Sequence, residues 1–404
     1  MREIVIGLLC AGAMLGASAE KPLALGSVQL LSERGSTRAA RYAVSNKIVT
    51  LGGKTHVAWL DSISQTMVAT YDRGADAWGD AVKVGDGADN HGGPALTCDS
   101  EGFLHIVFGP HTGPFQYCRS ARPNDAAAWV KQPEFGDHAT YPSMVCDDAD
   151  TLHIIYRGGD DPRKLLYQRK AKGGAWSAPR ILVHPDIKSG YTHYHSALTI
   201  APDDSLHISY DIYRHGAAKC AGHMMSRDHG DTWTLADGSA LALPVTPKSE
   251  AFFKRVDTAL KTAGIVCDSK GRPWITVSGP EVWHHDGAQW RCIVPRQLLP
   301  ALVDAQELSG VGPPALDVRD RLYVPAMLGR EVVMLYSIDQ GASFQLLHVF
   351  PPDETLPHTG LNMERPTGHH VVEIPWLLFS TGEKGPDCFG EGIFHKVRAV
   401  RLTW

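Results

Sequence analysis

Two histidines stand in glycine-rich segments twenty residues apart, in surroundings that leave an imidazole free to meet a substrate. His91 is followed by Gly-Gly-Pro, and His111 is preceded by Gly-Pro. A neutral imidazole accepts a proton near pH 7, and its protonated form donates one. The pair is therefore the first candidate for general acid–base chemistry.

Most of the twenty histidines have a different explanation. His105, His153 and His207 occupy one position of a repeated strand pattern, which predicts a role in packing each repeat. His193 aligns with His91 two repeats later and is a secondary, substrate-binding candidate.

A metal is the second kind of chemistry that the spacing suggests. Cys220 and His223 form a Cys-x-x-His pair, which is half of a zinc site. The remaining cysteines after residue 19 are dispersed, so we expect buried thiols rather than a disulfide scaffold. A structural zinc at Cys220 and His223 is an expectation, and a free thiol or a disulfide is the alternative.

These candidates lie in a chain that repeats itself about every fifty residues. Two short β-rich runs joined by a polar turn occur at 94–108, 142–156, 196–210, 264–277 and 314–324. A second hairpin ends each repeat in an aromatic residue, at Trp78, Trp129, Trp176, Trp233, Trp290 and Phe344. Their spacings of 51, 47, 57, 57 and 54 residues suit one four-stranded sheet per repeat.

One repeat carries the pattern S-x-D-x-G-x-T-W, at Ser226 to Trp233, and a weaker copy runs from Ser337 to Phe344. This is an Asp box, in which Ser and Asp side chains bond the turn backbone, Gly supplies a positive φ and the ring fills the space between sheets. The motif indicates folding rather than catalysis.

The repeats predict an all-β fold, a seven-bladed β-propeller of four-stranded blades. We expect the mature N-terminal strand at 27–31 to close the ring by pairing with 397–402. A pair of β-sandwich domains is the alternative, although sandwiches would not keep one period along the chain.

Residues 1–19 are predicted to be a signal peptide, with Arg2 before a short apolar run and Ala-Ser-Ala before Glu20. Residues 20–404 then form a single propeller domain of a secreted or periplasmic protein. A formal charge of −5 gives no sign of nucleic-acid binding. We expect no membrane anchor and a monomer.

The segment from Asp89 to Trp129, followed by Tyr141-Pro142 and Tyr156-Arg157, resembles the BNR-4 group of seven-bladed propellers, which includes ulvan lyases. The resemblance implies a polysaccharide lyase that cleaves a sulfated, uronic acid-containing polymer by β-elimination. Its partner would be an anionic polysaccharide, and no cofactor would be required for catalysis.

The resemblance also implies roles for individual residues. Acid–base work falls on His91, His111 and Tyr156, and a second tyrosine falls on Tyr210, with Tyr213 as a fallback. An arginine should bind the uronate carboxylate. We prefer Arg163, because it begins a strand on the face that carries the long loops, and Arg157 and Arg169 are the alternatives.

Two other functions stay open at this point. A sialidase-like exo-glycosidase would share the Asp boxes, but the Arg-Ile-Pro motif expected near the mature N-terminus is missing. A noncatalytic carbohydrate-binding propeller would need aromatic platforms without a convergent His, Tyr and Arg group.

Overall fold

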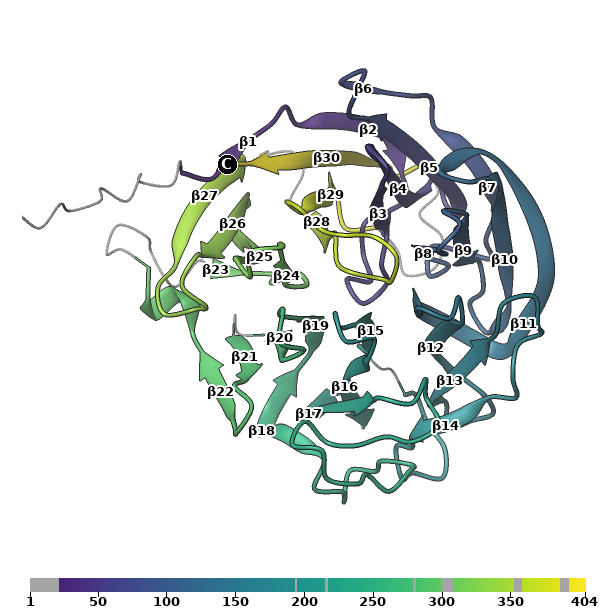
Figure 1. The fold of residues 1–404 in the computed structure, drawn as a ribbon, viewed down its shortest axis with the longest axis vertical. Helices are drawn as coiled ribbons and strands as arrows, with labels where there is room; N and C mark the ends of the chain where they lie inside the picture. Colours follow the sequence, from purple (N-terminus) through teal and green to yellow (C-terminus); the bar gives the residue numbers. More distant parts are fainter. Residues whose placement is uncertain are drawn as a thin grey trace, which may run out of the picture.

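The computed structural model describes residues 22–192, 195–214, 217–278, 281–299, 308–351, 358–385 and 392–404. Within these ranges the chain is built from antiparallel strands, with one 3-10 turn, η1 (Pro295–Gln297). Figure 1 shows the sheets arranged around a common centre, with β3, β15, β19, β24 and β28 close to it. The predicted all-β, propeller-like fold is confirmed. In the described part of the chain, no helix is long and apolar enough to cross a membrane.

The first and last described strands belong to one ten-stranded sheet, whose main path runs β28-β29-β30-β2-β4-β5-β6. Its strands are β1 (Ala24–Leu25), β2 (Gln29–Gly35), β3 (Ile48–Leu51), β4 (Lys54–Asp61), β5 (Gln65–Asp72), β6 (Ala77–Trp78), β7 (Val82–Asp86), β28 (His358–Met363), β29 (Trp376–Gly382) and β30 (His395–Thr403). Strand β2 pairs with β30, with Gln29 opposite Ala399. No sheet of the described residues closes on itself, so the closed ring of seven blades stays a prediction.

The next sheet has seven strands and carries the segments of interest. It contains β8 (Ala95–Cys98), β9 (Leu104–Phe108), β10 (Gly113–Arg122), β11 (Asp125–Cys146), β12 (Leu152–Gly158), β13 (Lys164–Lys170) and β14 (Arg180–Val183). The long strand β11 joins two units, because its first part pairs with β10 and its last part pairs with β12.

Three smaller sheets complete the described fold. The first contains β15 (Ala197–Ile200), β16 (Leu206–Arg214), β17 (Ala217–Ser226) and β18 (Phe252–Leu260). The second contains β19 (Thr262–Cys267), β20 (Pro273–Val277), β21 (Glu281–His285) and β22 (Trp290–Ile293). The third contains β23 (Leu308–Ser309), β24 (Ala315–Leu316), β25 (Leu322–Leu328), β26 (Glu331–Ser337) and β27 (Gln345–Phe350).

The repeated histidines pack the repeats, as predicted. His153 is fully buried on β12, where Nε2 lies 2.9 Å from Asp147 Oδ2 and Nδ1 lies 2.7 Å from the Tyr167 hydroxyl. His105 makes the same two contacts with the equivalent Asp and Tyr of the preceding repeat. An Asp–His–Tyr chain inside the sheet leaves no ring nitrogen for catalysis.

The Asp box also has its predicted local structure. Asp228 accepts hydrogen bonds from the Thr232 amide and hydroxyl at 2.8 and 2.5 Å, and Gly230 has φ +87°. Trp233 is buried in the core that the neighbouring strands share. Asp339 makes the corresponding bonds in the weaker copy.

The loop 364–375, between β28 and β29, ties several sheets together at the centre (Figure 1). The carbonyl oxygen of Thr367 accepts hydrogen bonds from the Cys146 amide and the Thr97 hydroxyl, both at 2.8 Å. Gly368 has φ +129°, and a Cβ there would lie 2.0 Å from the Cys146 carbonyl oxygen. The loop therefore requires glycine at this position.

We expect Gly368→Ala to lower the free energy of unfolding by about 3 kcal/mol, because a strained φ and a backbone clash combine. Gly53→Ala is the matched control, since Gly53 has φ +81° but open space around it. Its cost should be about 1 kcal/mol. Urea denaturation measures the free energy of unfolding of both variants. Equal losses would show that the loop 364–375 does not pack closely against Cys146.

Candidate active site

His91 and His111 are held side by side by one carboxylate. Asp89 Oδ1 lies 3.0 Å from His91 Nδ1, and Oδ2 lies 2.6 Å from His111 Nδ1. The two rings stack with centroids 4.0 Å apart and planes 14° apart. The predicted convergence of the two histidines is present, and Asp89 is the residue that produces it.

Two glycines allow the loops that carry these rings to meet. His91 lies between β7 and β8, and His111 lies between β9 and β10. The Gly109 amide bonds the Gly92 carbonyl oxygen at 3.2 Å. A Cβ on Gly92 would lie 2.8 Å from the Gly109 carbonyl oxygen, so a side chain there would push the loops apart. The glycine-rich sequence around the pair is thus a packing requirement.

The carboxylate decides which nitrogen of each ring is reactive. An acceptor at Nδ1 fixes the proton on that nitrogen, so acid–base chemistry falls to Nε2 of both rings. Burial lowers the pKa of His91, and the hydrogen bond to Asp89 only partly offsets this. Burial alone would raise the pKa of Asp89, but hydrogen bonds from His111 and His91 outweigh it and hold that pKa below its ordinary value. The site therefore contains a neutral His91 beside an ionised carboxylate.

Two tyrosines next to the pair have unusual backbones. Tyr42, between β2 and β3, and Tyr141, within β11, both have φ +60°. This conformation is strained for a bulky residue and typically occurs at functional sites. The two rings lie 4.8 Å apart, and they lie 6.2 Å and 6.3 Å from the His91 ring. Burial raises the pKa of both phenols, to about 12 for Tyr42, so both hold a proton to donate.

Arg157 on β12 supplies a buried guanidinium beside these rings. Its side chain is 6% exposed, and it lies 5.7 Å from the Tyr141 ring centroid and 5.1 Å from that of Tyr191. Among the described residues, Nε and Nη1 have no hydrogen-bond partner. A buried cation with two unused donors favours an anionic ligand.

A second cation borders the same group. Arg38 donates a hydrogen bond to the Tyr42 hydroxyl, and its charge contributes to the lowered pKa of His91. The arrangement thus combines a base, two proton donors and two guanidinium groups.

A further histidine, which no sequence pattern singled out, has the same anchoring. His195 directs both its amide and its Nδ1 toward Asp211, at 3.0 and 3.2 Å. The bonds between His91 and Asp89 have this same form. The two aspartates occupy different sequence positions relative to their histidines, so no spacing rule would have found the second pair.

The structure does not bring Tyr156 to this site, which corrects the prediction that Tyr156 has an acid–base role. Its side chain is fully buried in the core, where the hydroxyl donates to Gln168 Oε1 at 2.5 Å. Neighbouring side chains on a strand point to opposite faces. Because the Arg157 side chain faces Tyr141, the Tyr156 side chain points to the other face of the strand, into the hydrophobic core.

Two other predicted binding residues have hydrogen-bond partners outside the histidine pair. Tyr210 is fully buried, and its hydroxyl donates to the Ala251 carbonyl oxygen at 2.8 Å, so its predicted substrate contact is also a correction. Arg163 lies in the loop after β12 and bonds the Gly159 carbonyl oxygen of that same loop. His193 lies outside the described residues.

The Cys220 and His223 side chains lie on opposite faces of β17, because they are three positions apart on a strand. Cys220 packs in the apolar core with Met224, whereas His223 Nε2 lies 3.1 Å from His207 Nδ1. One zinc ion cannot contact both, and these two residues do not fit a shared metal site.

The general class is therefore a propeller-like, all-β protein with a pair of imidazoles at its candidate site. Comparison of the chain with known proteins identifies its family. A model described as BNR repeat-containing family member matches residues 54–287, which is more than half of the chain. The chain belongs to the BNR repeat-containing family, as its sequence motifs indicated.

Two curated relatives are ulvan lyases. That of Alteromonas sp. (strain LOR) is 26% identical over 301 residues, covering 59% of this chain and 61% of the relative. That of Nonlabens ulvanivorans is 24% identical over 298 residues, covering 59% of this chain and 63% of the relative. The matched region spans less than two thirds of each relative.

Solved structures extend the likeness to nearly the whole chain. A PL25 ulvan lyase bound to GlcA(1-4)Rha3S has a TM-score of 0.74 at 17% identity and covers 91% of this chain and 95% of its own. Polysaccharide lyase Uly1 has a TM-score of 0.61 at 12% identity, with coverage of 95% and 98%. At these identities the likeness establishes the fold.

We expect His91 to titrate below the ordinary histidine pKa of 6.5, and Asp89→Asn to lower its pKa further. The reason is that the carboxylate favours the imidazolium through its hydrogen bond and its charge. Imidazole chemical shifts followed against pH measure this. Asp99→Asn removes the carboxylate that bonds Nε2 of His105 and should leave the pKa of His91 unchanged. A rise of the His91 pKa in Asp89→Asn would contradict the anchoring role of Asp89.

Proposed function

We propose that this protein is a polysaccharide lyase that cleaves a uronic acid-containing, ulvan-like polysaccharide by β-elimination. The observation that carries the proposal is the His91/His111 pair on Asp89, with the buried and unsatisfied guanidinium of Arg157 nearby. The ulvan lyase relatives and the shared fold support the same reaction class.

The reaction assigns tasks to Arg157, His91, Asp89 and one of the two tyrosines. Arg157 binds the uronate carboxylate and stabilises the charge that develops on it when the C5 proton leaves. His91 takes that proton at Nε2, and Asp89 stabilises the resulting imidazolium. The electron pair of the C5–H bond forms the C4=C5 double bond as the C4–O4 bond breaks. Tyr42 or Tyr141 protonates the departing O4 oxygen, and proton exchange with solvent resets both groups.

The proposal also covers the blade number, the localisation and the oligomeric state of the enzyme. We propose a seven-bladed propeller in which β1 and β2 complete the sheet of β28, β29 and β30, supported by the pairing of β2 with β30. Export through residues 1–19, a monomeric state and the lack of a membrane anchor stay predictions, and residues 1–19 lie outside the described chain. A structural zinc stays a prediction without support from Cys220 and His223.

The direct test is to incubate the purified protein with ulvan and follow the ultraviolet absorbance of the unsaturated uronate. Absorbance should rise together with new reducing ends. Reducing ends without this absorbance would mean hydrolysis, as in the exo-glycosidase alternative, and binding without either would mean a carbohydrate-binding propeller. Repeating the assay after dialysis against EDTA tests the expectation that catalysis needs no cofactor.

Matched substitutions separate the residues of the site from those of the core. Tyr141→Phe should reduce kcat by about 10²-fold if its phenol is the acid, whereas Tyr156→Phe should act mainly on stability. Arg157→Lys should lower kcat/KM strongly, because the ammonium keeps the charge but loses the fork, while Arg163→Lys should change it little. A larger effect at Arg163 than at Arg157 would restore Arg163 as the carboxylate ligand.

The pH dependence follows from the two shifted groups. The base must be neutral, so kcat/KM should fall with decreasing pH, with a midpoint below 6.5, the ordinary value for histidine. Tyr42 has a pKa of about 12, so no loss from its ionisation is expected near neutral pH. A midpoint above neutrality in the pH–rate profile would exclude His91 as the base.

A further inference from the structure

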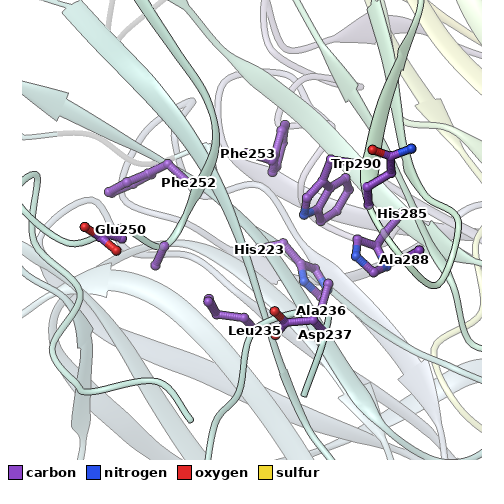
Figure 2. A pocket seen from close by; sticks show the side chains of 12 residues that line it. His223, Leu235, Ala236, Asp237, Glu250, Phe252, Phe253, His285, Ala288 and Trp290 are labelled. Atoms are coloured by element: carbon purple, nitrogen blue, oxygen red, sulfur yellow. The ribbon is translucent and has the colours of Figure 1, made fainter. Parts of the chain in front are cut away.

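A cavity of about 310 Å³ lies between the outer strands of two neighbouring sheets, and Figure 2 shows the side chains that line it. Strands β17 and β18 form one wall, and the turn between β21 and β22 forms the other. Its volume is at the lower end of the range for small-molecule sites, about 300–1,000 Å³. None of the described residues that line it belongs to the site of His91.

The cavity has an aromatic wall. Trp290 stacks on Phe253 at 4.5 Å and meets the edges of His223 and His285 at 5.5 and 5.3 Å. Phe252 also lines the cavity, nearer to Glu250 (Figure 2). Flat apolar surfaces of this kind pack well against the C–H face of a sugar ring.

A chain of hydrogen bonds makes His223 an acceptor toward the cavity. Ser205 donates its hydroxyl proton to Asp203 at 2.5 Å, so its oxygen accepts from His207 Nε2 at 2.8 Å. His207 Nδ1 then accepts from His223 Nε2 at 3.1 Å. Burial lowers the pKa of both histidines, which agrees with neutral rings. The second nitrogen, His223 Nδ1, is therefore an unprotonated acceptor.

This acceptor is buried and unsatisfied. His223 is 3% exposed, and Nδ1 has no hydrogen-bond partner among the described residues. Asp237 and Glu250 add two carboxylate acceptors to the lining. His285 supplies the opposite polarity, because its Nδ1 accepts from the Gly287 amide at 3.3 Å and its Nε2 then carries the proton.

The ligand must therefore offer both donors and acceptors on an apolar frame. Sugar hydroxyls do both, whereas a quaternary ammonium group offers no donor. Among the described residues that line the cavity, the two carboxylates are the only Asp, Glu, Lys or Arg side chains. Arg255 lies behind the wall, 4.4 Å from the Phe252 ring centroid, and its guanidinium donates to the Pro247 and Ser249 carbonyl oxygens. A uronate or sulfated sugar would therefore be repelled by the two carboxylates. We propose that this cavity is a second, noncatalytic carbohydrate site that binds an uncharged monosaccharide unit. The inference does not depend on lyase activity.

The test is saturation-transfer NMR of the full-length protein with L-rhamnose, D-xylose, D-galactose and D-glucuronate, followed by calorimetric titration of any sugar that binds. At least one uncharged sugar should bind, and D-glucuronate should not compete with it. His223→Leu should weaken binding by about tenfold or more, because the central acceptor is lost. Glu250→Gln changes only an exposed carboxylate and keeps the test valid if His223→Leu fails to fold.

Glu250→Gln should weaken the same sugar measurably, and His91→Ala should leave its binding unchanged. Cleavage of short soluble substrates should be unaffected by Glu250→Gln, which separates this inference from the proposed lyase function. Binding lost in His91→Ala would place the sugar in the other site and overturn the proposal. Failure of all three uncharged sugars to bind, or preferential binding of D-glucuronate, would also overturn it.

Discussion

One buried carboxylate, that of Asp89, organises the proposed chemistry. It bonds two imidazoles whose rings lie 4.0 Å apart, so a positive charge on both would cost about 4 kcal/mol at an effective dielectric constant of 20. The single negative charge of Asp89 stabilises the imidazolium that His91 becomes when it takes the C5 proton in the proposed reaction.

The surrounding fold supplies the close approach that this arrangement needs. Gly92 and Gly109 let two loops touch through their backbones, and the seven-stranded sheet fixes where the loops begin. Tyr42 and Tyr141 adopt left-handed backbone conformations, which place their rings next to the ring of His91. Strain at two bulky residues persists because the packed sheets on either side determine their positions.

The sequence was sufficient to predict the all-β, propeller-like fold and the convergence of the two histidines. The repeat spacing and the Asp boxes predict where the strands lie, and the glycines around His91 and His111 indicate that two loops pack closely there. Tyr156 and Tyr210 could not be judged in this way, because a one-residue difference in strand phase moves a side chain from one face to the other. Asp89 and Tyr42 were missed because their roles depend on contacts between separate loops.

The choice of Arg157 over Arg163 also could not be made from the sequence. It is adjacent to Tyr156, and sequence reasoning kept it as an alternative to Arg163 without a means to choose. The burial of its guanidinium and its unsatisfied nitrogens distinguish it from Arg163, whose side chain bonds its own loop. Exposure and hydrogen-bond satisfaction are properties of the folded chain, and residue type alone does not predict them.

The most direct measurement is a crystal structure of the His91→Ala variant with a uronate-containing oligosaccharide bound. The account predicts that the uronate carboxylate accepts hydrogen bonds from Arg157 and that C5 faces the space left by the His91 ring, with Tyr42 or Tyr141 near O4. A carboxylate bound to Arg163, or a sugar that places C5 away from Asp89 and His111, would contradict it.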